Sequence, residues 1–143
     1  MNDTNPQAGR TLSIVIPVYN EKDTWRDLLG RVLAVKLPGW RKEIVLVEDG
    51  SSDGTREQLR QFAAEQEGTA ADAATACRVI LHAQNRGKGA ALRTGFAAVT
   101  GEVVIIQDAD LEYDPQDYPL VLAPFDDPRV QVVYGSRFAE NRS

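Results

Sequence analysis

The sequence has 143 residues, of which 43% are hydrophobic and 26% charged, so it fits one globular domain that buries a substantial core. Its 16 Lys and Arg against 21 Asp and Glu give a net charge of -5, which argues against a protein that binds nucleic acid through a basic face. The single cysteine, Cys77, excludes an internal disulfide framework, and the sequence shows neither a secretory signal nor the ~20 consecutive apolar residues of a membrane span.

The chain begins with polar residues 1–10, which we expect to form a disordered tail, and residues 11–143 are then predicted to form one domain. Apolar runs rich in Val and Ile alternate with segments of helical period, and the runs barely alternate in polarity, as is typical of strands covered on both faces. The predicted strands are 12–18, 43–48, 78–82, 102–107 and 130–134.

Helices are predicted between these strands because apolar residues recur on one helical face. The first carries Trp25, Leu28 and Val32, and the third carries Leu92 and Phe96. The second carries Leu59 and Phe62 and is expected to be capped by Asp53. Alternating strands and helices indicate right-handed crossovers and a mostly parallel α/β sheet with helices on both faces.

Ligands bind such sheets beyond the carboxyl ends of the strands, and the polar clusters of this chain fall at those ends. In the first cluster, PVYNE, Tyr19 offers a flat face for a base or ribose, although the last two residues also suit a helix cap. In the second, EDGSSDG, Asp49 can accept hydrogen bonds from a base or ribose, whereas Asp53 fits a capped turn.

The third cluster, NRGKGAA, has small residues at a helix start, where backbone N–H groups can approach an anion and Lys88 adds charge. It matches neither a P-loop nor a dinucleotide fingerprint, and a packing role for its glycines fits equally well. The single histidine, His82, precedes this cluster without an evident partner, and we expect it to be structural.

The fourth cluster, QDADLE, follows an apolar run and gives the sharpest signal. On an extended backbone Asp108, Asp110 and Glu112 point the same way and would repel one another unless a cation lies between them. Mg²⁺ or Mn²⁺ prefers carboxylate oxygens together with phosphate and water, which predicts a metal-bound nucleotide diphosphate; the alternative is a solvated acidic turn. In the fifth cluster, YGSRF, the guanidinium of Arg137 suits a phosphate, unless it is an ordinary surface arginine.

Together these segments resemble glycosyltransferase family 2, and within it the polyprenyl-phosphate sugar synthases of the dolichyl-phosphate mannose synthase type. The resemblance covers about residues 12–138 in the family's order. The stretches that carry it are IPVYNE, VEDGSSDGT, NRGKGAALRTGF, QDADLEYDP and YGSRF. Two residues depart from the pattern: Glu48 stands where many relatives have aspartate, and Glu112 where mannose synthases often have glutamine.

The resemblance implies a GT-A fold and an inverting transfer from a nucleotide-sugar donor such as GDP-mannose or UDP-glucose. Asp110 and Glu112 would hold Mg²⁺ or Mn²⁺, and the residues expected to take part in catalysis are Asp108, Asp110 and Arg137, the last facing a phosphate. The residues implied to contact the donor are Pro17, Tyr19, Glu21, Val47, Asp49, Lys88, Asp108, Ala109 and Asp110.

The implied acceptor is a polyprenyl or dolichyl phosphate at the cytoplasmic face of a membrane, to which the full-length protein would be peripheral. A lipid phosphate is largely ionised near neutral pH, since its second pKa is about 6, and needs no strong general base. Family members usually continue beyond the YGSRF strand, so we expect this chain to end after the fifth strand and to hold the donor-binding part.

Several alternatives remain open from the sequence. The chain would be a donor-binding module without turnover if the missing part supplies the acceptor site, or a transferase acting on a sugar hydroxyl. A nucleotidyltransferase usually has a Gly-rich loop after the first strand, where this chain has PVYNE. A phospho-receiver domain needs an aspartate ending the third strand and a lysine after the fifth, where this chain has His82 and Arg137.

Overall fold

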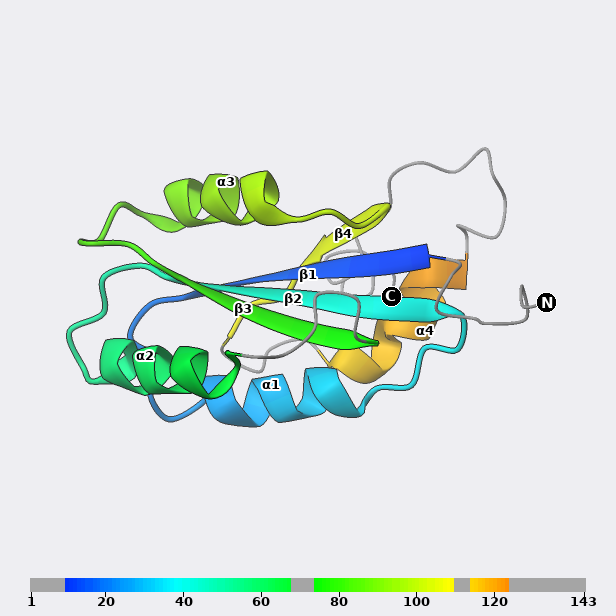
Figure 1. Cartoon of the computed structure of the whole chain (residues 1–143), viewed down its shortest axis with the longest axis horizontal. Coiled ribbons are helices and arrows are strands. Elements are labelled where there is room, and N and C mark those ends of the chain that lie inside the picture. Colours follow the sequence, from blue (N-terminus) through cyan, green and yellow to red (C-terminus); the bar gives the residue numbers. More distant parts are fainter. Residues whose placement is uncertain (1–9, 68–73, 110–113, 124–143) are drawn as a thin grey trace, which may run out of the picture.

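A four-stranded sheet forms the centre of the protein in a computed structural model that describes residues 10–67, 74–109 and 114–123 (Figure 1). All three strand pairs are parallel, and the spatial order is β3-β2-β1-β4. The strands are β1 (Arg10–Val18), β2 (Trp40–Glu48), β3 (Thr75–Leu81) and β4 (Val103–Ile106). The predicted mostly parallel sheet is therefore confirmed, while the predicted fifth strand at 130–134 lies outside the described residues.

Helices cover both faces of the sheet, as predicted. Figure 1 shows α3 on one face and both α1 and α2 on the other. A short 3₁₀ turn, η3, and the helix α4 follow β4 and pack on the side of α1. The bounds are α1 (Trp25–Ala34), α2 (Thr55–Glu65), α3 (Lys88–Ala98), η3 (Pro115–Asp117) and α4 (Tyr118–Leu122).

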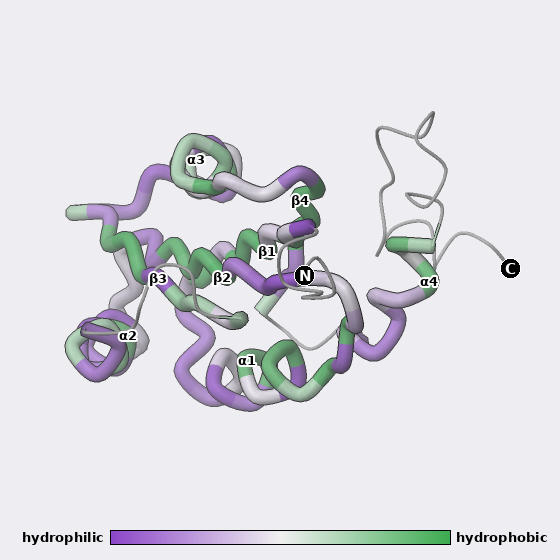
Figure 2. The backbone as a smooth tube through the Cα atoms, turned by 45° about the vertical axis from the view of Figure 1, so that its right-hand side comes forward, coloured by the Kyte–Doolittle hydropathy of each residue, from purple (hydrophilic) through white to green (hydrophobic). Residues whose placement is uncertain are grey.

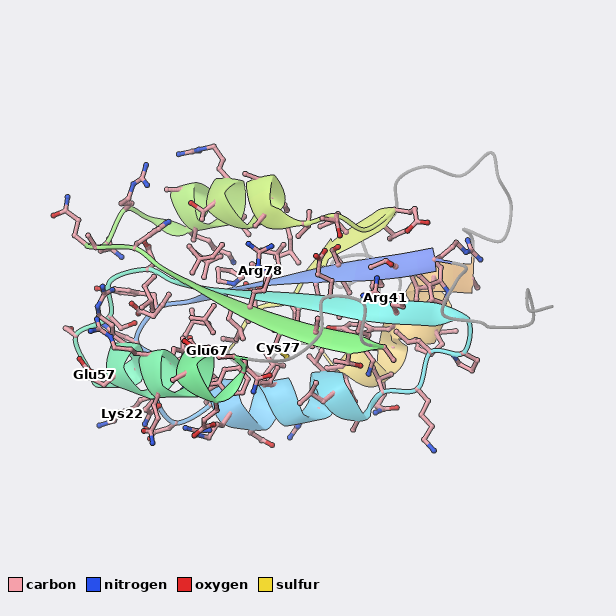
Figure 3. The ribbon with its side chains drawn as sticks, viewed as in Figure 1. Lys22, Arg41, Glu57, Glu67, Cys77 and Arg78 are labelled. Carbon is pink, nitrogen blue, oxygen red and sulfur yellow. The ribbon has the colours of Figure 1, made fainter. Side chains whose placement is uncertain are left out.

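The core has two layers because alternate residues of a strand face opposite sides of the sheet. Ile14 and Ile44 are fully buried on the side of α1 and α2, whereas Val45 and Val47 are fully buried against α3. Figure 2 shows these strands as the most hydrophobic part of the backbone. On the edge strand β3, Cys77 faces the first layer and its neighbour Arg78 faces α3, where it donates to the Ala98 carbonyl (Figure 3).

All four described strands begin or end away from the predicted positions: β1, β2 and β3 start earlier, and β4 is shorter at both ends. β1 begins at Arg10, so the prediction of a tail reaching residue 10 is wrong at that residue; residues 1–9 lie outside the described part. Arg10 pairs in register with Trp40, and its guanidinium lies 4.4 Å from the centre of the Trp40 ring. Because pairing and stacking extend β1 and β2 through polar residues at their starts, the apolar runs missed the first residues of these strands.

The buried Lys42 joins β2 to the end of α1. Its ammonium Nζ donates to the carbonyls of Val32, Leu33 and Val35 at 3.0, 2.9 and 2.6 Å. The last carbonyls of a helix have no partner within the helix, so this side chain supplies the missing donor at the end of α1. Burial lowers the pKa of Lys42, against an opposing effect from nearby Cys77.

None of the helices in the described part of the chain has the length and apolar character needed to cross a membrane.

Candidate functional site

The loops that follow β1, β2 and β3 lie together at one edge of the sheet, at the left of Figure 1, as expected for parallel strands. The first two are tied to each other by Asn20, which has a left-handed φ of 53°. Its backbone N–H donates to the Ser51 hydroxyl at 2.8 Å, and its side-chain oxygen accepts from the Ser52 N–H at 2.9 Å. Asn20 therefore aligns the first predicted cluster with the second.

Glu48 shapes the turn after β2 from inside the protein. Its carboxylate is fully buried and accepts hydrogen bonds from the amides of Gly50 and Ser51 at 3.0 and 2.7 Å. It also pairs with the guanidinium of Arg56 on α2 at 3.2 Å. A buried carboxylate needs such partners, and these contacts account for both of its oxygens.

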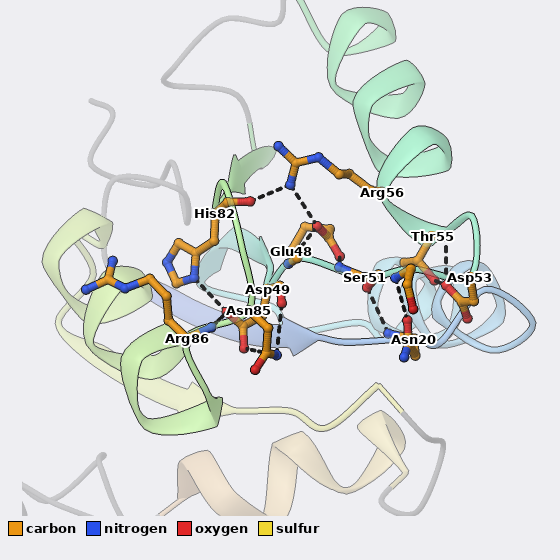
Figure 4. Close-up of polar contacts among 12 residues, drawn as sticks. Asn20, Glu48, Asp49, Ser51, Asp53, Thr55, Arg56, His82, Asn85 and Arg86 are labelled. Atoms are coloured by element: carbon orange, nitrogen blue, oxygen red, sulfur yellow. Dashed lines mark hydrogen bonds and ion pairs between the residues drawn. The ribbon is translucent and has the colours of Figure 1, made fainter.

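Asp49 is buried as well, and its carboxylate binds the loop that follows β3 (Figure 4). One oxygen accepts from His82 Nδ1 and the Arg86 amide, and the other from the Asn85 side chain and the Gly87 amide, all at 2.8–3.0 Å. Burial by itself would raise the pKa of Asp49, but donation from the His82 ring and the two loop amides outweighs it and lowers that pKa below its ordinary 3.8.

The loop after β3 lies directly on Gly50. A Cβ atom at this glycine would lie 2.3 Å from the Asn85 backbone nitrogen, and the φ of 75° also disfavours any side chain. The first glycine of the EDGSSDG motif, Gly50, is thus required because a second loop approaches it closely.

Lys88 and Asp108 form the polar contact that joins the third and fourth clusters. The Lys88 ammonium at the start of α3 lies 2.6 Å from the carboxylate of Asp108, which follows β4. Their side chains are 57% and 26% exposed, so both can meet a ligand. An accessible cation beside an accessible carboxylate suits a ligand with a phosphate and hydroxyl groups.

The backbone before Asp108 is fixed by Gln107. This buried side chain accepts a hydrogen bond from the Tyr118 hydroxyl at 2.7 Å, and its backbone N–H donates to the Val15 carbonyl at 2.9 Å. Burial raises the pKa of Tyr118, which therefore stays a neutral donor. Asp108 is held in this way against both β1 and α4.

The remaining predicted donor-binding residues differ in accessibility. Tyr19 is 47% exposed at this edge, and Pro17 is half-buried at the end of β1. Glu21 lies before α1, and its carboxylate accepts from the Thr24 hydroxyl; the cap of α1 is Thr24, so the alternative that Glu21 itself caps this helix is wrong. Val47 and Ala109 have buried side chains within the core.

The predicted metal ligands Asp110 and Glu112, together with Arg137, lie outside the described residues. Within the described ranges, no three His, Cys, Asp or Glu side chains gather in a way that could hold a metal ion. Asp108 is the one acidic residue of the QDADLE motif that the structure describes, and its partly exposed carboxylate is a suitable donor type for Mg²⁺ or Mn²⁺.

Two details of the site were missed from the sequence. His82 does have partners, since it contacts Asp49 and Thr94, although its expected structural role agrees with its burial. Asp53 accepts from the Thr55 amide at 3.0 Å, but the capping position itself is Gly54. The contact between His82 and Asp49 follows from the register Glu48↔Leu81, because these two residues come directly after that pair on neighbouring strands.

Comparison with known proteins gives consistent matches. Residues 13–143 match the family model described as Glycosyl transferase family 2. The chain is 40% identical over 119 residues to an undecaprenyl-phosphate 4-deoxy-4-formamido-L-arabinose transferase from Klebsiella pneumoniae subsp. pneumoniae. The match covers 82% of this chain but only 34% of the relative, so the chain spans about a third of that protein's length.

Two solved structures share the fold. A mannosyltransferase from Pyrobaculum calidifontis in complex with GDP-Man and Mn²⁺ is 28% identical, with a TM-score of 0.60 over 78% of this chain and 31% of that one. Glucosyl-3-phosphoglycerate synthase from Mycobacterium tuberculosis, in complex with Mn²⁺, UDP and glucosyl-3-phosphoglycerate, is 26% identical. Its TM-score is 0.60 over 84% of this chain and 41% of that one.

Proposed function

Because the chain belongs to glycosyl transferase family 2, we propose that it is the donor-binding part of an enzyme that transfers a sugar from a nucleotide diphosphate. The observation that carries this proposal is the gathering of the strand-end loops around an accessible Lys88–Asp108 pair, 2.6 Å apart. The two solved relatives with bound nucleotide or nucleotide-sugar support the choice of ligand.

Different described residues are proposed to contact different parts of the donor. The exposed Tyr19 ring packs on the base or ribose, and the Lys88 ammonium binds the diphosphate. Asp108 accepts from hydroxyl groups of the donor once Lys88 turns to the phosphates. Pro17, Glu21, Val47, Asp49 and Ala109 stay as predicted members of the pocket wall, the last three through their backbone because their side chains are buried.

Asp110 and Glu112 are proposed to hold Mg²⁺ or Mn²⁺, which when bound neutralises the charge that the leaving diphosphate gains. The Mn²⁺ named in both solved relatives supports this role. Arg137 is proposed to add a second positive charge at a phosphate. Transfer is proposed to invert the sugar's anomeric carbon, because the acceptor attacks from the face opposite the diphosphate.

The acceptor is proposed to be a polyprenyl phosphate at the cytoplasmic face of a membrane. The name of the Klebsiella relative, an undecaprenyl-phosphate transferase, supports this class. An ionised phosphate oxygen is already nucleophilic, so the described residues need supply no strong base. A sugar-hydroxyl acceptor would need a carboxylate base instead.

Isothermal calorimetry with GDP, UDP and their sugars, with and without Mn²⁺, tests the donor site. We expect metal-dependent binding that Lys88→Met weakens about 10- to 100-fold, the loss for one charge-assisted hydrogen bond. Lys36→Met is the matched control, since this exposed lysine lies between α1 and β2 at the other end of the sheet. If the unaltered chain binds none of these nucleotides with metal present, the proposed function is wrong.

A further inference from the structure

His82 is a buried junction between four segments of the chain (Figure 4). Its ring nitrogens Nδ1 and Nε2 lie 2.8 Å from the Asp49 carboxylate and 2.8 Å from the Thr94 hydroxyl. Its backbone N–H donates to the Glu48 carbonyl at 2.8 Å, and its own carbonyl accepts from the Arg56 guanidinium. Both ring nitrogens and both backbone polar groups are therefore bonded, and they connect the end of β2 with α2 and α3.

The partners fix the direction of each hydrogen bond. The Asp49 carboxylate only accepts, so His82 carries a proton on Nδ1 and donates it to Asp49. In the neutral ring Nε2 is then an acceptor, and the Thr94 hydroxyl donates to it. Thr94 lies inside α3, so the ring links this helix to Asp49 at the end of β2.

The consequence reaches the loop between β3 and α3. The Asp49 carboxylate that His82 orients also accepts from the amides of Arg86 and Gly87, the last residues before α3. The next residue, Lys88, carries the ammonium that contacts Asp108. Hydrogen bonds thus run from the buried ring through Asp49 to the Gly87 amide, and the backbone joins Gly87 directly to Lys88.

Gly50 packs directly against the backbone of the same loop. The Asn85 backbone lies so close to it that no side chain would fit, and the Asn85 side chain donates back to the Asp49 carbonyl at 3.1 Å. The loop is held both by its close contact with Gly50 and by its hydrogen bonds to Asp49. Its shape therefore depends on Asp49 keeping one orientation, which is what the His82 ring provides.

We propose that His82 is a positioning residue of the donor site: through Asp49 and Thr94 it holds loop 83–87 in the shape that presents Lys88 to the donor. The expected effect on donor binding rests on the proposed function, whereas the expected effect on the shape of the loop does not. If His82 only stabilised the fold, replacing it would lower the melting temperature without changing donor affinity at a temperature where the protein stays folded.

Three variants separate the contacts of the ring. His82→Phe keeps a ring of similar size and removes both nitrogens. Thr94→Val removes only the hydroxyl and is the milder change, available if the first variant folds poorly. His82→Asn places a side-chain N–H near the position of Nδ1, so it can still donate to Asp49 and is the expected rescue.

Two measurements are made on each variant of the 143-residue chain. Amide hydrogen exchange without ligand should be about tenfold faster at Arg86 and Gly87 in His82→Phe, since their acceptor is no longer oriented. The Kd of the best nucleotide with Mn²⁺ should rise about 10- to 100-fold, as when a residue that orients a ligand group is removed. His82→Asn should recover most of both.

Lys42→Met serves as the stability control, because Lys42 lies at the opposite end of β2 and caps α1. It should lower the melting temperature and leave the Kd unchanged. Unchanged exchange at Arg86 and Gly87 in His82→Phe overturns the inference, and so does a Kd equal to that of the unaltered chain. Absence of nucleotide binding in the unaltered chain overturns the proposed function instead, and the exchange result then still decides whether His82 holds the loop.

Discussion

Two adjacent acids at the end of β2, Glu48 and Asp49, have different roles, although the sequence shows them as one pair. Glu48 accepts from the turn that follows it and pairs with α2, whereas Asp49 accepts from the loop of another strand. Both carboxylates are turned inward and are satisfied by protein donors. At the scale of single residues, these two acidic side chains therefore hold the neighbouring loops in shape.

This arrangement predicts acid sensitivity. The pKa of Asp49 is lower in the folded protein than in the unfolded chain, so its ionised contacts stabilise the fold above the ordinary value of 3.8. That stabilisation is lost progressively as the pH falls through the lower, folded pKa. Asp49→Asn should cost about 1–3 kcal/mol at pH 7, because the loop donors lose their charged acceptor.

Urea unfolding at pH 7 and at pH 3 tests this prediction. The difference in unfolding free energy between Asp49→Asn and the unaltered chain should shrink at the lower pH. A difference that is the same at both values would show that the carboxylate's charge contributes nothing. Glu43 also has a lowered pKa, since hydrogen bonds from Ser13 and Thr100 outweigh the effect of its burial. The unaltered chain should therefore lose stability at pH 3 through Glu43 as well as through Asp49.

At the scale of elements, Lys42 shows how one side chain sets the end of a helix. α1 ends at Ala34, and the ammonium of Lys42 accounts for three carbonyls around that end. A lysine near the start of a strand would normally be assigned to the surface. The sequence pattern therefore predicted α1 and β2 but not the contact that joins them.

Lys42→Met is expected to destabilise the protein by about 2–4 kcal/mol, because it leaves the buried carbonyls of Val32 and Val35 without this donor. Lys42→Arg keeps the charge but is too large for the same space, and should be intermediate. Chemical denaturation monitored by Trp fluorescence measures both. A loss below about 0.5 kcal/mol for Lys42→Met, the usual range of a surface substitution, would contradict the capping role.

The alternation of strands and helices was predictable because apolar runs and helical faces have distinct periods. The face predicted for α3 through Leu92 and Phe96 was wrong, because α3 packs on the sheet through the small residues Ala91 and Gly95 and leaves Phe96 exposed. The placing of Lys88 and Asp108 at one sheet edge was predictable too, since both follow parallel strands. The strand starts were not, because pairs such as Arg10 and Trp40 depend on a partner distant in sequence. Nor were the contacts of His82 predictable, because its partners come from three other segments.

For the whole molecule, binding of a donor to the folded state alone must raise its stability. A nucleotide with Mn²⁺ at 100 times its Kd should add about 2.7 kcal/mol to the unfolding free energy. Thermal unfolding at increasing nucleotide concentration measures this, and Lys88→Met should shift the whole dependence to higher concentration. A melting temperature that does not respond to saturating nucleotide would contradict specific binding to the native protein.

The sheet order also has a consequence for synthesis on the ribosome. β1 emerges first, but one of its edges pairs with β4, where the Thr11 amide contacts Glu102, 91 residues later. At about 5–20 residues per second, the nascent chain spends many seconds with this apolar strand open on one side. Until β4 arrives, β1 is a site for wrong strand pairing, and the newly made protein should depend on chaperones more than the finished one does.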